Sequence, residues 1–495
     1  MESINIIPEE PNHILLNFLP PDAKLILDFG CGDGSLGKQY KQINPHGKYI
    51  GIETDRDLVK NAAQFLDGVI YTNSPQLDEF SLNINPQTVD CIIYQENFAQ
   101  IRNSEELLQK QVSWLKENGQ LIACIPNVQH WQRILKLMQG KWEATGENQV
   151  DALRFFTLTS IKNMFTRLGL YIFDIQRRGR HEQKDFEEFQ QVFAPTLANM
   201  GIDANKFAKD TWAYQYIVRS TKTAKPPRSL FITTLIRSPS GRDRVRILDP
   251  DRFSSTIPGV RTFASQKPID LTTPLAKEEK VFIWQAAILG YPQDLPALKT
   301  LLKQDYLMVA EFDDDPLHRP EYEQNKFLSF RGCHCVQTTN ETLAKYLREL
   351  NPNVAVFPNQ LTYLPAPRIY NNDDYITLFF GALLREKEWP SIMPAINRIL
   401  NSYKDKVRVK VIHDRLFFDA LETANKEFTP FCPLEQYEAI MHSSDIGILP
   451  LLPTRYNSMK SDLKFIQCAG HGVAVLASPT MYENSIVEGE TGLLY

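Results

Sequence analysis

The stretch ILDFGCGDGSLG (Ile26–Gly37) decides the fold of the first part of the chain. Apolar residues lead into Asp28, and glycines then follow at every second position, at Gly30, Gly32 and Gly34. Glycine lets the backbone turn sharply after a strand and lets a ligand approach without a Cβ in the way. A helix that starts after such a turn presents free N–H groups, which favour an anionic or carboxylate-bearing ligand. The stretch therefore predicts a buried strand, a ligand-binding turn and a helix.

A second acidic residue favours a nucleotide-like ligand at this turn. The segment YIGIET places Glu53 at the end of the next predicted strand. A carboxylate at that place can accept hydrogen bonds from both hydroxyls of a ribose. Three glycines alone are weak evidence, because dinucleotide sites and plain tight turns also use them. The order here is D-x-G-x-G-x-G, which differs from the G-x-G-x-x-G of dinucleotide sites.

Strand-like and helix-like patterns alternate over residues 1–220. Two helices are predicted, at RDLVKNAAQFL and at EELLQKQVSWLKEN, and two closing strands near residues 170–178 and 212–220. Strands that alternate with helices predict a mainly parallel sheet covered on both faces. The remaining predicted strands are KLILDF, GKYIGIET, VDCIIYQ and GQLIACIPN.

The rest of the chain predicts two further α/β units. Residues 221–228 are polar and contain a Pro pair, which predicts a linker. One βα series begins at LFITTLIR and covers residues 229–366, and another begins at YITLFFGALL and covers residues 367–495. A chain of 495 residues is long enough for about three core units.

Composition narrows the function classes. Lys and Arg number 54 and Asp and Glu number 59, which gives a net charge of −5. No long basic run favours nucleic acid or an anionic membrane surface. The seven scattered cysteines fit a reducing cytosol, and CHC at Cys333–Cys335 has no second cluster with zinc spacing. Without a signal-like N-terminus or a long apolar run, we expect a cytoplasmic protein with no transmembrane segment.

On these motifs, residues from about 10 to 220 resemble class I S-adenosylmethionine (SAM)-dependent methyltransferases. The resemblance implies a Rossmann-like domain whose aspartate–glycine turn holds the methionine part of SAM and whose second-strand acid holds the ribose. It places Asn73, after the third strand, near the adenine and Gln95, after the fourth strand, on the methionine side. The implied cofactor contacts are Asp28, Gly30, Gly32, Gly34, Glu53, Asn73 and Gln95.

The segments LKENGQLIACIPN and LRFFTLTS are similar to one subgroup of that family, and the chain departs from the subgroup at three positions. Ala99 and Gln100 stand where a glutamate and a histidine are expected, and Ala152 stands where a histidine is frequent. These departures put the catalytic rate or the type of substrate in doubt and leave cofactor binding in place. A domain that binds the cofactor without catalysis is the alternative.

A second glycine pattern, FFGALLREKEW, follows a predicted strand in the last unit. Arg385 and Lys387 lie where a loop would deliver cations to a phosphate. Guanidinium and ammonium groups neutralise a diphosphate leaving group and so assist departure of a nucleotide from a sugar. The alternative is a solvated basic turn.

The segment KSDLKFIQCAGHGVAVLAS resembles the nucleotide-sugar half of GT-B glycosyltransferases of the group 1 type. The resemblance implies an acceptor lobe at residues 229–366 and a donor lobe at 367–495, which is incomplete because the family continues beyond ETGLLY. Gln467 stands where the family has a glutamate facing the donor ribose, and Ala382 stands where it has an arginine, a role that falls to Arg385. The donor-facing positions are Gly381, Arg385, Lys387, Lys460, Ser461, Lys464 and Gln467.

The acidic segment AEFDDDP ends a predicted strand of the acceptor lobe. An Asp-x-Asp triplet holds Mg²⁺ in the other large glycosyltransferase fold, whereas the resembling fold generally uses no metal. We therefore expect an acidic loop near the cleft and no metal, with a metal site as the alternative. In a catalytic role, Asp313 would orient the acceptor hydroxyl.

Together these patterns predict a bifunctional transferase. The first half would methylate a substrate hydroxyl with SAM, and the second would transfer a sugar from a nucleotide-sugar donor. The shared acceptor would be a glycan or lipid-linked glycan of surface or secreted polysaccharide synthesis, without nucleic acid as a partner and with peripheral membrane contact left open. Two rivals remain: a glycosyltransferase with a methyltransferase-like scaffold, and a binding protein with both sites degenerate.

Overall fold

The chain forms two compact units in a computed structural model. The first comprises Met1–Ser229 with Arg252–Arg261, and the second comprises Leu230–Asp251 with Thr262–Tyr495. The structure describes residues 11–72, 84–95, 97–101, 103–141, 153–179, 183–223, 227–237, 243–271, 274, 277–370 and 375–495.

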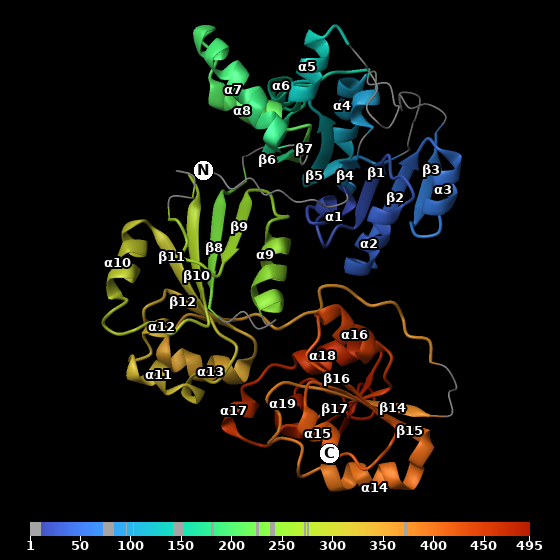
Figure 1. The fold of residues 1–495 in the computed structure, drawn as a ribbon, viewed down its shortest axis with the longest axis vertical. Helices are drawn as coiled ribbons and strands as arrows, with labels where there is room; N and C mark the ends of the chain where they lie inside the picture. The colour runs from blue at the N-terminus through green and yellow to red at the C-terminus, as the bar shows by residue number, and fades with distance from the viewer. Residues whose placement is uncertain are drawn as a thin grey trace. The chain divides into compact units, whose positions relative to one another are not determined.

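A seven-stranded sheet in the order β3-β2-β1-β4-β5-β7-β6 is the centre of the first unit (Figure 1). Strands β1 to β5 are parallel, and β7 runs antiparallel to both β5 and β6. The strand order reverses between β1 and β4, and ligands of open α/β sheets bind outside the carboxyl ends of the strands at such a point. The strands are β1 Leu25–Phe29, β2 Lys48–Glu53, β3 Gly68–Tyr71, β4 Val89–Tyr94, β5 Leu115–Pro126, β6 Leu170–Arg178 and β7 Gln215–Lys222.

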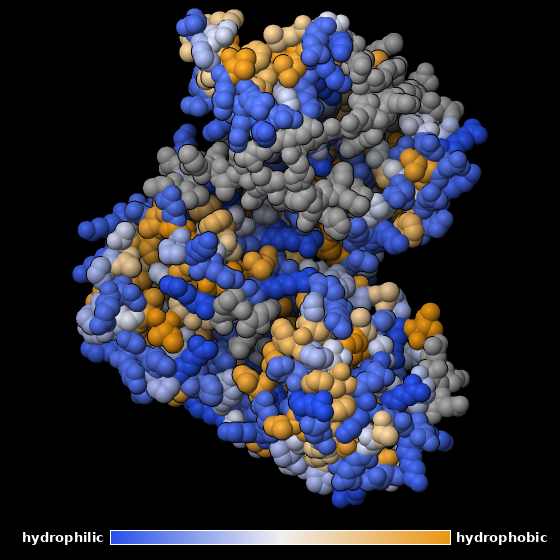
Figure 2. All heavy atoms as spheres, viewed as in Figure 1, coloured by the Kyte–Doolittle hydropathy of each residue, from blue (hydrophilic) through white to orange (hydrophobic). Residues whose placement is uncertain are grey.

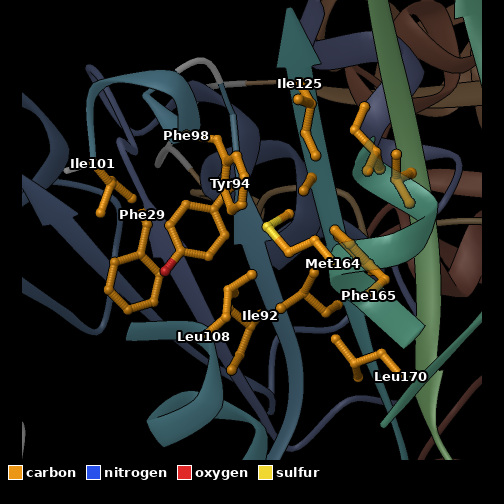
Figure 3. Close-up of a cluster of buried hydrophobic side chains, with 14 of the residues drawn as sticks. Phe29, Ile92, Tyr94, Phe98, Ile101, Leu108, Ile125, Met164, Phe165 and Leu170 are labelled. Atoms are coloured by element: carbon orange, nitrogen blue, oxygen red, sulfur yellow. The ribbon is translucent and has the colours of Figure 1, made fainter. Parts of the chain in front are cut away.

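Both faces of this sheet are buried, as the mainly apolar strands predict. In β1, Leu27 and Phe29 point into one hydrophobic cluster and Ile26 into another. Figure 3 shows the first cluster, in which Phe29 stacks on Tyr94 and Tyr94 meets the edge of Phe98. The helices are α1 Pro11–Leu16, α2 Ser35–Ile43, α3 Arg56–Ala62, α4 Ser104–Trp114, α5 Trp131–Met138, α6 Leu158–Arg167, α7 Gln183–Asn199 and α8 Ala204–Trp212, with a 3₁₀ turn η1 at Phe98–Gln100.

Two sequence predictions for the first unit are corrected by the structure. The helix predicted to run through Asn118 ends at Trp114, and Leu115 already begins β5 because it pairs with Val89 ahead of a register shift. The predicted linker begins too early, since β7 continues through Lys222. Thr221 lies inside the sheet, paired with Gln120 on one side and with a residue of β6 on the other.

Two sheets make up the second unit, with parallel pairing among β8 and β10 to β13 in one and among β14 to β19 in the other. One has the order β13-β12-β11-β10-β8-β9 and the other the order β16-β15-β14-β17-β18-β19. The order of the latter reverses between β14 and β17, which predicts a ligand crevice there. The strands are β8 Leu230–Ile236, β9 Val260–Ser265, β10 Glu279–Gln285, β11 Tyr306–Glu311, β12 Cys335–Thr338, β13 Val354–Val356, β14 Ile376–Gly381, β15 Val407–Ile412, β16 Lys426–Thr429, β17 Ile446–Leu449, β18 Ala474–Ala477 and β19 Leu493–Leu494.

Helices cover both faces of the β14 sheet, since Phe379 and its neighbour Phe380 belong to different hydrophobic clusters. Helices α16 and α18 lie side by side in Figure 1, and Met441 contacts Cys468 between them. The helices and turns are η2 Arg244–Leu248, α9 Asp249–Ser254, α10 Leu295–Lys303, η3 Pro316–His318, α11 Pro320–Gln324, α12 Leu328–Arg331, α13 Glu341–Leu350, α14 Met393–Tyr403, η4 Lys404–Lys406, α15 Arg415–Ala420, α16 Leu434–His442, α17 Arg455–Ser458, α18 Leu463–Gly470 and α19 Pro479–Tyr482.

Polar side chains predominate on the face drawn in Figure 2, with apolar ones scattered among them. Within the ranges given above, no helix is long and apolar enough to cross a membrane. Among the same residues, no group of three or more His, Cys, Asp or Glu side chains is placed to hold a metal ion.

Candidate functional site

Asp28, the acid that precedes the glycine turn, is buried near the carboxyl end of β1, with a side chain that is 1% exposed. Its Oδ2 accepts a hydrogen bond from the Tyr49 hydroxyl over 2.7 Å and one from Gln95 Nε2 over 2.8 Å. Its Oδ1 is buried and has no hydrogen-bond partner within the described part of the chain. Burial raises the pKa of Asp28 to about 7, although both hydrogen bonds oppose the rise.

Glu53, at the end of β2, holds the turn and the loop that follows its own strand. Its Oε2 accepts a hydrogen bond from the Gly32 N–H over 2.8 Å. Its Oε1 accepts from the N–H groups of Thr54, over 2.7 Å, and Asp55, over 3.2 Å. The Thr54 hydroxyl also donates to Oε1, over 3.2 Å, so a further donor would be accepted at Oε2, which takes one hydrogen bond within the described residues.

The three predicted glycines all adopt left-handed backbone conformations, with φ of 78° at Gly30, 58° at Gly32 and 82° at Gly34. Their surroundings differ. A Cβ on Gly34 would lie 2.8 Å from Ala62, and one on Gly30 would lie 2.9 Å from the Asn97 amide, whereas one on Gly32 would meet nothing within 4 Å. The space beside Gly32 is therefore open, whereas at Gly30 and Gly34 a side chain would clash with Asn97 and Ala62 of the protein itself.

Other sequence-predicted positions fall into three groups. Gln95 follows β4, and its backbone N–H donates to the Phe29 carbonyl, so it lies beside the turn as predicted. Asn73 and Ala152 lie outside the described residues. Ala99 lies in η1, where its carbonyl accepts from the N–H groups of Leu153 and Arg154 and its side chain is buried, with Gln100 beside it in the same turn.

These residues fit the methionine and ribose parts of SAM. The unpaired Asp28 Oδ1 is an acceptor suited to an ammonium group, and Glu53 is a carboxylate beside a backbone turn without a Cβ at Gly32. All of them lie near the carboxyl ends of β1, β2 and β4, around the point where the strand order reverses. The sequence prediction missed Tyr49, whose position on the same face of β2 as Glu53 was the available signal.

A second constellation lies at the carboxyl end of β14, in the second unit. Gly381 ends this strand, and its carbonyl accepts a hydrogen bond over 3.4 Å from the Tyr437 hydroxyl, which accepts one over 2.7 Å from Lys464 Nζ. Arg385 follows in the loop, 3.8 Å from Glu388. Burial lowers the pKa of Lys464 to about 8, and the nearby positive charge of Arg385 contributes to this shift.

The remaining donor-side predictions do not gather at that point. Lys387 is exposed. Gln467 lines a different pocket with Arg244, Tyr363 and His471, and its buried Oε1 has no hydrogen-bond partner within the described residues.

Two further donor-side residues contact the first sheet of the second unit. Lys460 Nζ lies 3.5 Å from Asp314, and the Ser461 hydroxyl accepts a hydrogen bond from Asn359 over 2.9 Å. Asp313 lies next to Asp314 in a pocket at the ends of β10 and β11, together with His318 and Gln285. The acidic loop is therefore partly neutralised from within the unit, and its third carboxylate, Asp315, pairs with Arg455 over 3.2 Å.

Comparison with known proteins assigns part of the chain. A family model described as a methyltransferase domain matches residues 6–175, which is less than half of the chain. No curated protein matches the chain.

Solved structures similar to the chain include SAM-dependent methyltransferases from three organisms. The Thermotoga maritima protein is 14% identical, with 43% of this chain and 88% of that one covered and a TM-score of 0.30. The Archaeoglobus fulgidus protein is 13% identical, with 42% and 90% covered and a TM-score of 0.31. The Mesorhizobium loti protein is 15% identical, with 43% and 98% covered and a TM-score of 0.29.

The assignment of the first part of the chain rests on the family model together with the strand order, in which five parallel strands are followed by an antiparallel pair. The first unit therefore contains a methyltransferase domain.

Proposed function

We propose that the first unit transfers a methyl group from SAM to a substrate hydroxyl at the β1–β4 crevice. The observation that carries this proposal is that two acids adjoin one glycine turn. Asp28 is buried in the strand that leads into the turn, and Glu53 accepts a hydrogen bond from the Gly32 N–H in the turn. Asp28 and Gln95 would hold the methionine part, and Glu53 the ribose. The bound cofactor supplies an electrophilic methyl group on a sulfonium. The acceptor oxygen would take this methyl group as the carbon–sulfur bond breaks, the thioether product would leave, and the hydroxyl proton would pass to water.

The chain's own contribution to this reaction is mainly placement of the two reactants. Ala99 and Gln100 supply neither a carboxylate nor an imidazole in the turn after β4. Holding a nucleophile in line with the methyl group can by itself lower the barrier substantially, because translational and rotational entropy is lost on binding. The proposed reaction therefore depends on the fit of the acceptor rather than on a strong general base in η1.

The test is methyl transfer by the full chain with radiolabelled SAM, offered polysaccharide and lipid-linked glycan fractions as acceptors. We expect label in a glycan fraction, and loss of that label with Glu53→Gln but not with Asp57→Asn, an exposed acid on the next helix that pairs with Lys60. Binding of SAM without methyl transfer to any acceptor would favour a scaffold that binds the cofactor.

A second activity, glycosyl transfer from a nucleotide sugar, is proposed for the second unit. It is favoured by Gly381, Arg385 and Lys464 at the reversal point of the β14 sheet, where the positive charge of Arg385 contributes to the lowered pKa of Lys464. A diphosphate would relieve that repulsion. In this proposal Asp313 orients the acceptor hydroxyl and Lys387 adds positive charge to the loop.

Hydrolysis or transfer of a panel of UDP-, GDP- and dTDP-sugars by the full chain tests this second activity. We expect one nucleotide class to bind and its binding to fall at least tenfold with Arg385→Gln. A folded protein that binds none of these nucleotides would leave the methyltransferase as the chain's enzymatic activity. If both activities are found, a shared glycan acceptor is tested by adding both donors to one acceptor preparation.

A further inference from the structure

Tyr49 is buried at the start of β2, and its side chain is 0% exposed. Its hydroxyl lies 2.7 Å from Asp28 Oδ2, which also accepts from Gln95 Nε2 over 2.8 Å. Both donors thus meet the same carboxylate oxygen, one from each strand that neighbours β1. The other oxygen, Oδ1, is buried and has no partner within the part of the chain that the structure describes.

We propose that Tyr49 is a positioning residue of the cofactor site, which fixes the Asp28 carboxyl so that Oδ1 is left to accept a hydrogen bond from the ammonium group of bound SAM. This inference rests on the proposed function of the first unit. A tyrosine hydroxyl has a single proton to donate, and at Tyr49 that proton is directed to Asp28. A carboxyl held by two donors on one oxygen cannot rotate freely, so the orientation of the second oxygen is determined before the cofactor arrives.

The charge of Asp28 must be present for this role, and its surroundings oppose that charge. The groups that face it are Tyr49 and Glu53 from β2, Cys91 from β4 and Cys31 from the turn. Burial raises the pKa of both thiols, so they are neutral, and the Glu53 carboxylate disfavours a second negative charge nearby. The two hydrogen bonds to Oδ2 are therefore what favours the ionised carboxyl in the free protein.

The experiment measures SAM affinity of the full chain by calorimetry from pH 5.5 to 8.5. We expect wild-type affinity to fall as the pH decreases and Asp28 takes up a proton. Tyr49→Phe removes one donor to the carboxylate, so the midpoint of this fall should move upward by about one pH unit. Because the Asp28 carboxyl is then less firmly oriented, affinity relative to wild type should also be lower at pH 8.5, where the carboxyl is mostly ionised in both proteins. Replacing Tyr49 by a ring-fluorinated tyrosine, a stronger donor that keeps the hydroxyl, should move the midpoint downward.

Tyr40→Phe is the matched control. Tyr40 is equally buried in the same cluster, but its hydroxyl donates to the Pro20 carbonyl and does not touch Asp28. Its removal should leave the midpoint in place. In the Asp28→Asn background, where residue 28 no longer titrates, adding Tyr49→Phe should leave the pH profile of that single variant unchanged.

The possible results separate the two proposals. A Tyr49→Phe protein with the wild-type midpoint, or with wild-type affinity at pH 8.5, overturns the role of Tyr49 and leaves the cofactor site intact. If Tyr49→Phe does not fold, the fluorinated protein decides, and an unmoved midpoint there overturns the role. A folded wild-type protein that binds no SAM at any pH overturns the proposed function itself, and this inference with it.

Discussion

Glu53 Oε2 accepts a hydrogen bond from the Gly32 N–H over 2.8 Å. The two residues are brought together because β1 and β2 are parallel neighbours and end at the same edge of the sheet, where Phe29 pairs with Ile52. The acid that would bind the ribose therefore also fixes the turn that would bind the methionine part. One carboxylate couples the two halves of the proposed cofactor site.

Gly32→Ala is predicted to weaken SAM binding more than it weakens folding. A Cβ at Gly32 would enter open space, but φ is 58°, so the strain is about 1 kcal/mol. Gly37→Ala, five residues later, is the contrasting variant, since its Cβ would lie 2.3 Å from Leu66 and 2.8 Å from Tyr49. We expect calorimetry to show lost SAM affinity in a folded Gly32→Ala protein and urea titration to show a destabilised Gly37→Ala protein. Unchanged SAM affinity in Gly32→Ala would contradict a ligand at this turn.

Asp28→Asn is predicted to flatten the pH dependence of stability. Burial raises the pKa of Asp28 from 3.8 to about 7, so between these values the folded unit holds a proton that the unfolded chain releases. The stability of the wild type should then fall as the pH rises from 4 to 7, by as much as about 4 kcal/mol. Urea unfolding at several pH values checks this, with the exposed Asp22→Asn as control. Parallel curves for wild type and Asp28→Asn would contradict it.

Asn127→Ala is predicted to destabilise the first unit by about 2–4 kcal/mol, because it leaves buried backbone carbonyls without donors. Asn127 is 0% exposed, and its amide nitrogen donates to the carbonyls of Asp210 and Ala213, over 2.7 Å in each case. Denaturant titration measures the loss, with Asn205→Ala on the exposed side of α8 as control. Equal stability of the two variants would show that the two hydrogen bonds of Asn127 contribute little to the stability of the unit.

Binding of a nucleoside diphosphate to the second unit is predicted to strengthen about tenfold as the pH falls from 9 to 7. Lys464 has a pKa lowered to about 8 by burial and by Arg385, so it gains its positive charge over this range. Affinity titrations with UDP and GDP check the expectation, and Lys464→Gln should abolish the pH dependence. The control is Lys410→Gln, whose ammonium contacts Ser443 instead. If Lys464→Gln keeps the pH dependence of nucleotide binding, another group than Lys464 is responsible for it.

Much of the first site follows from sequence, because its residues lie at strand ends. A parallel sheet places the ends of β1, β2 and β4 at one edge, so Asp28, Glu53 and Gln95 were predictable from where each predicted strand stops. Tyr49 shares a face of β2 with Glu53, which is a sequence signal, but it lies at the start of its strand and reaches Asp28 only through the register of β1 with β2. Side-chain length and register decide that contact, and neither is a spacing motif.

The second unit shows where sequence patterns lose precision. Lys460, Ser461, Lys464 and Gln467 lie within eight positions of one another, and the resemblance assigned all of them to one donor. The structure divides them: Lys464 lies beneath Gly381, Lys460 and Ser461 contact the first sheet of the unit, and Gln467 lines a separate pocket. Lys460 and Ser461 precede α18, which begins at Leu463, so the loop before the helix and not the helix itself sets their surroundings. The early end of α4 was missed because strand pairing at Leu115 overrode the local helical pattern.

Calorimetric titration of SAM into the full chain tests the central claim most directly, with wild type, Glu53→Gln and Asp57→Asn measured side by side at pH 8. We predict micromolar binding by wild type and Asp57→Asn, and affinity at least tenfold weaker for Glu53→Gln, since it loses a charged partner of the turn and of the ribose. A folded wild-type protein that releases no heat and shows no binding by equilibrium dialysis at millimolar SAM would contradict the account.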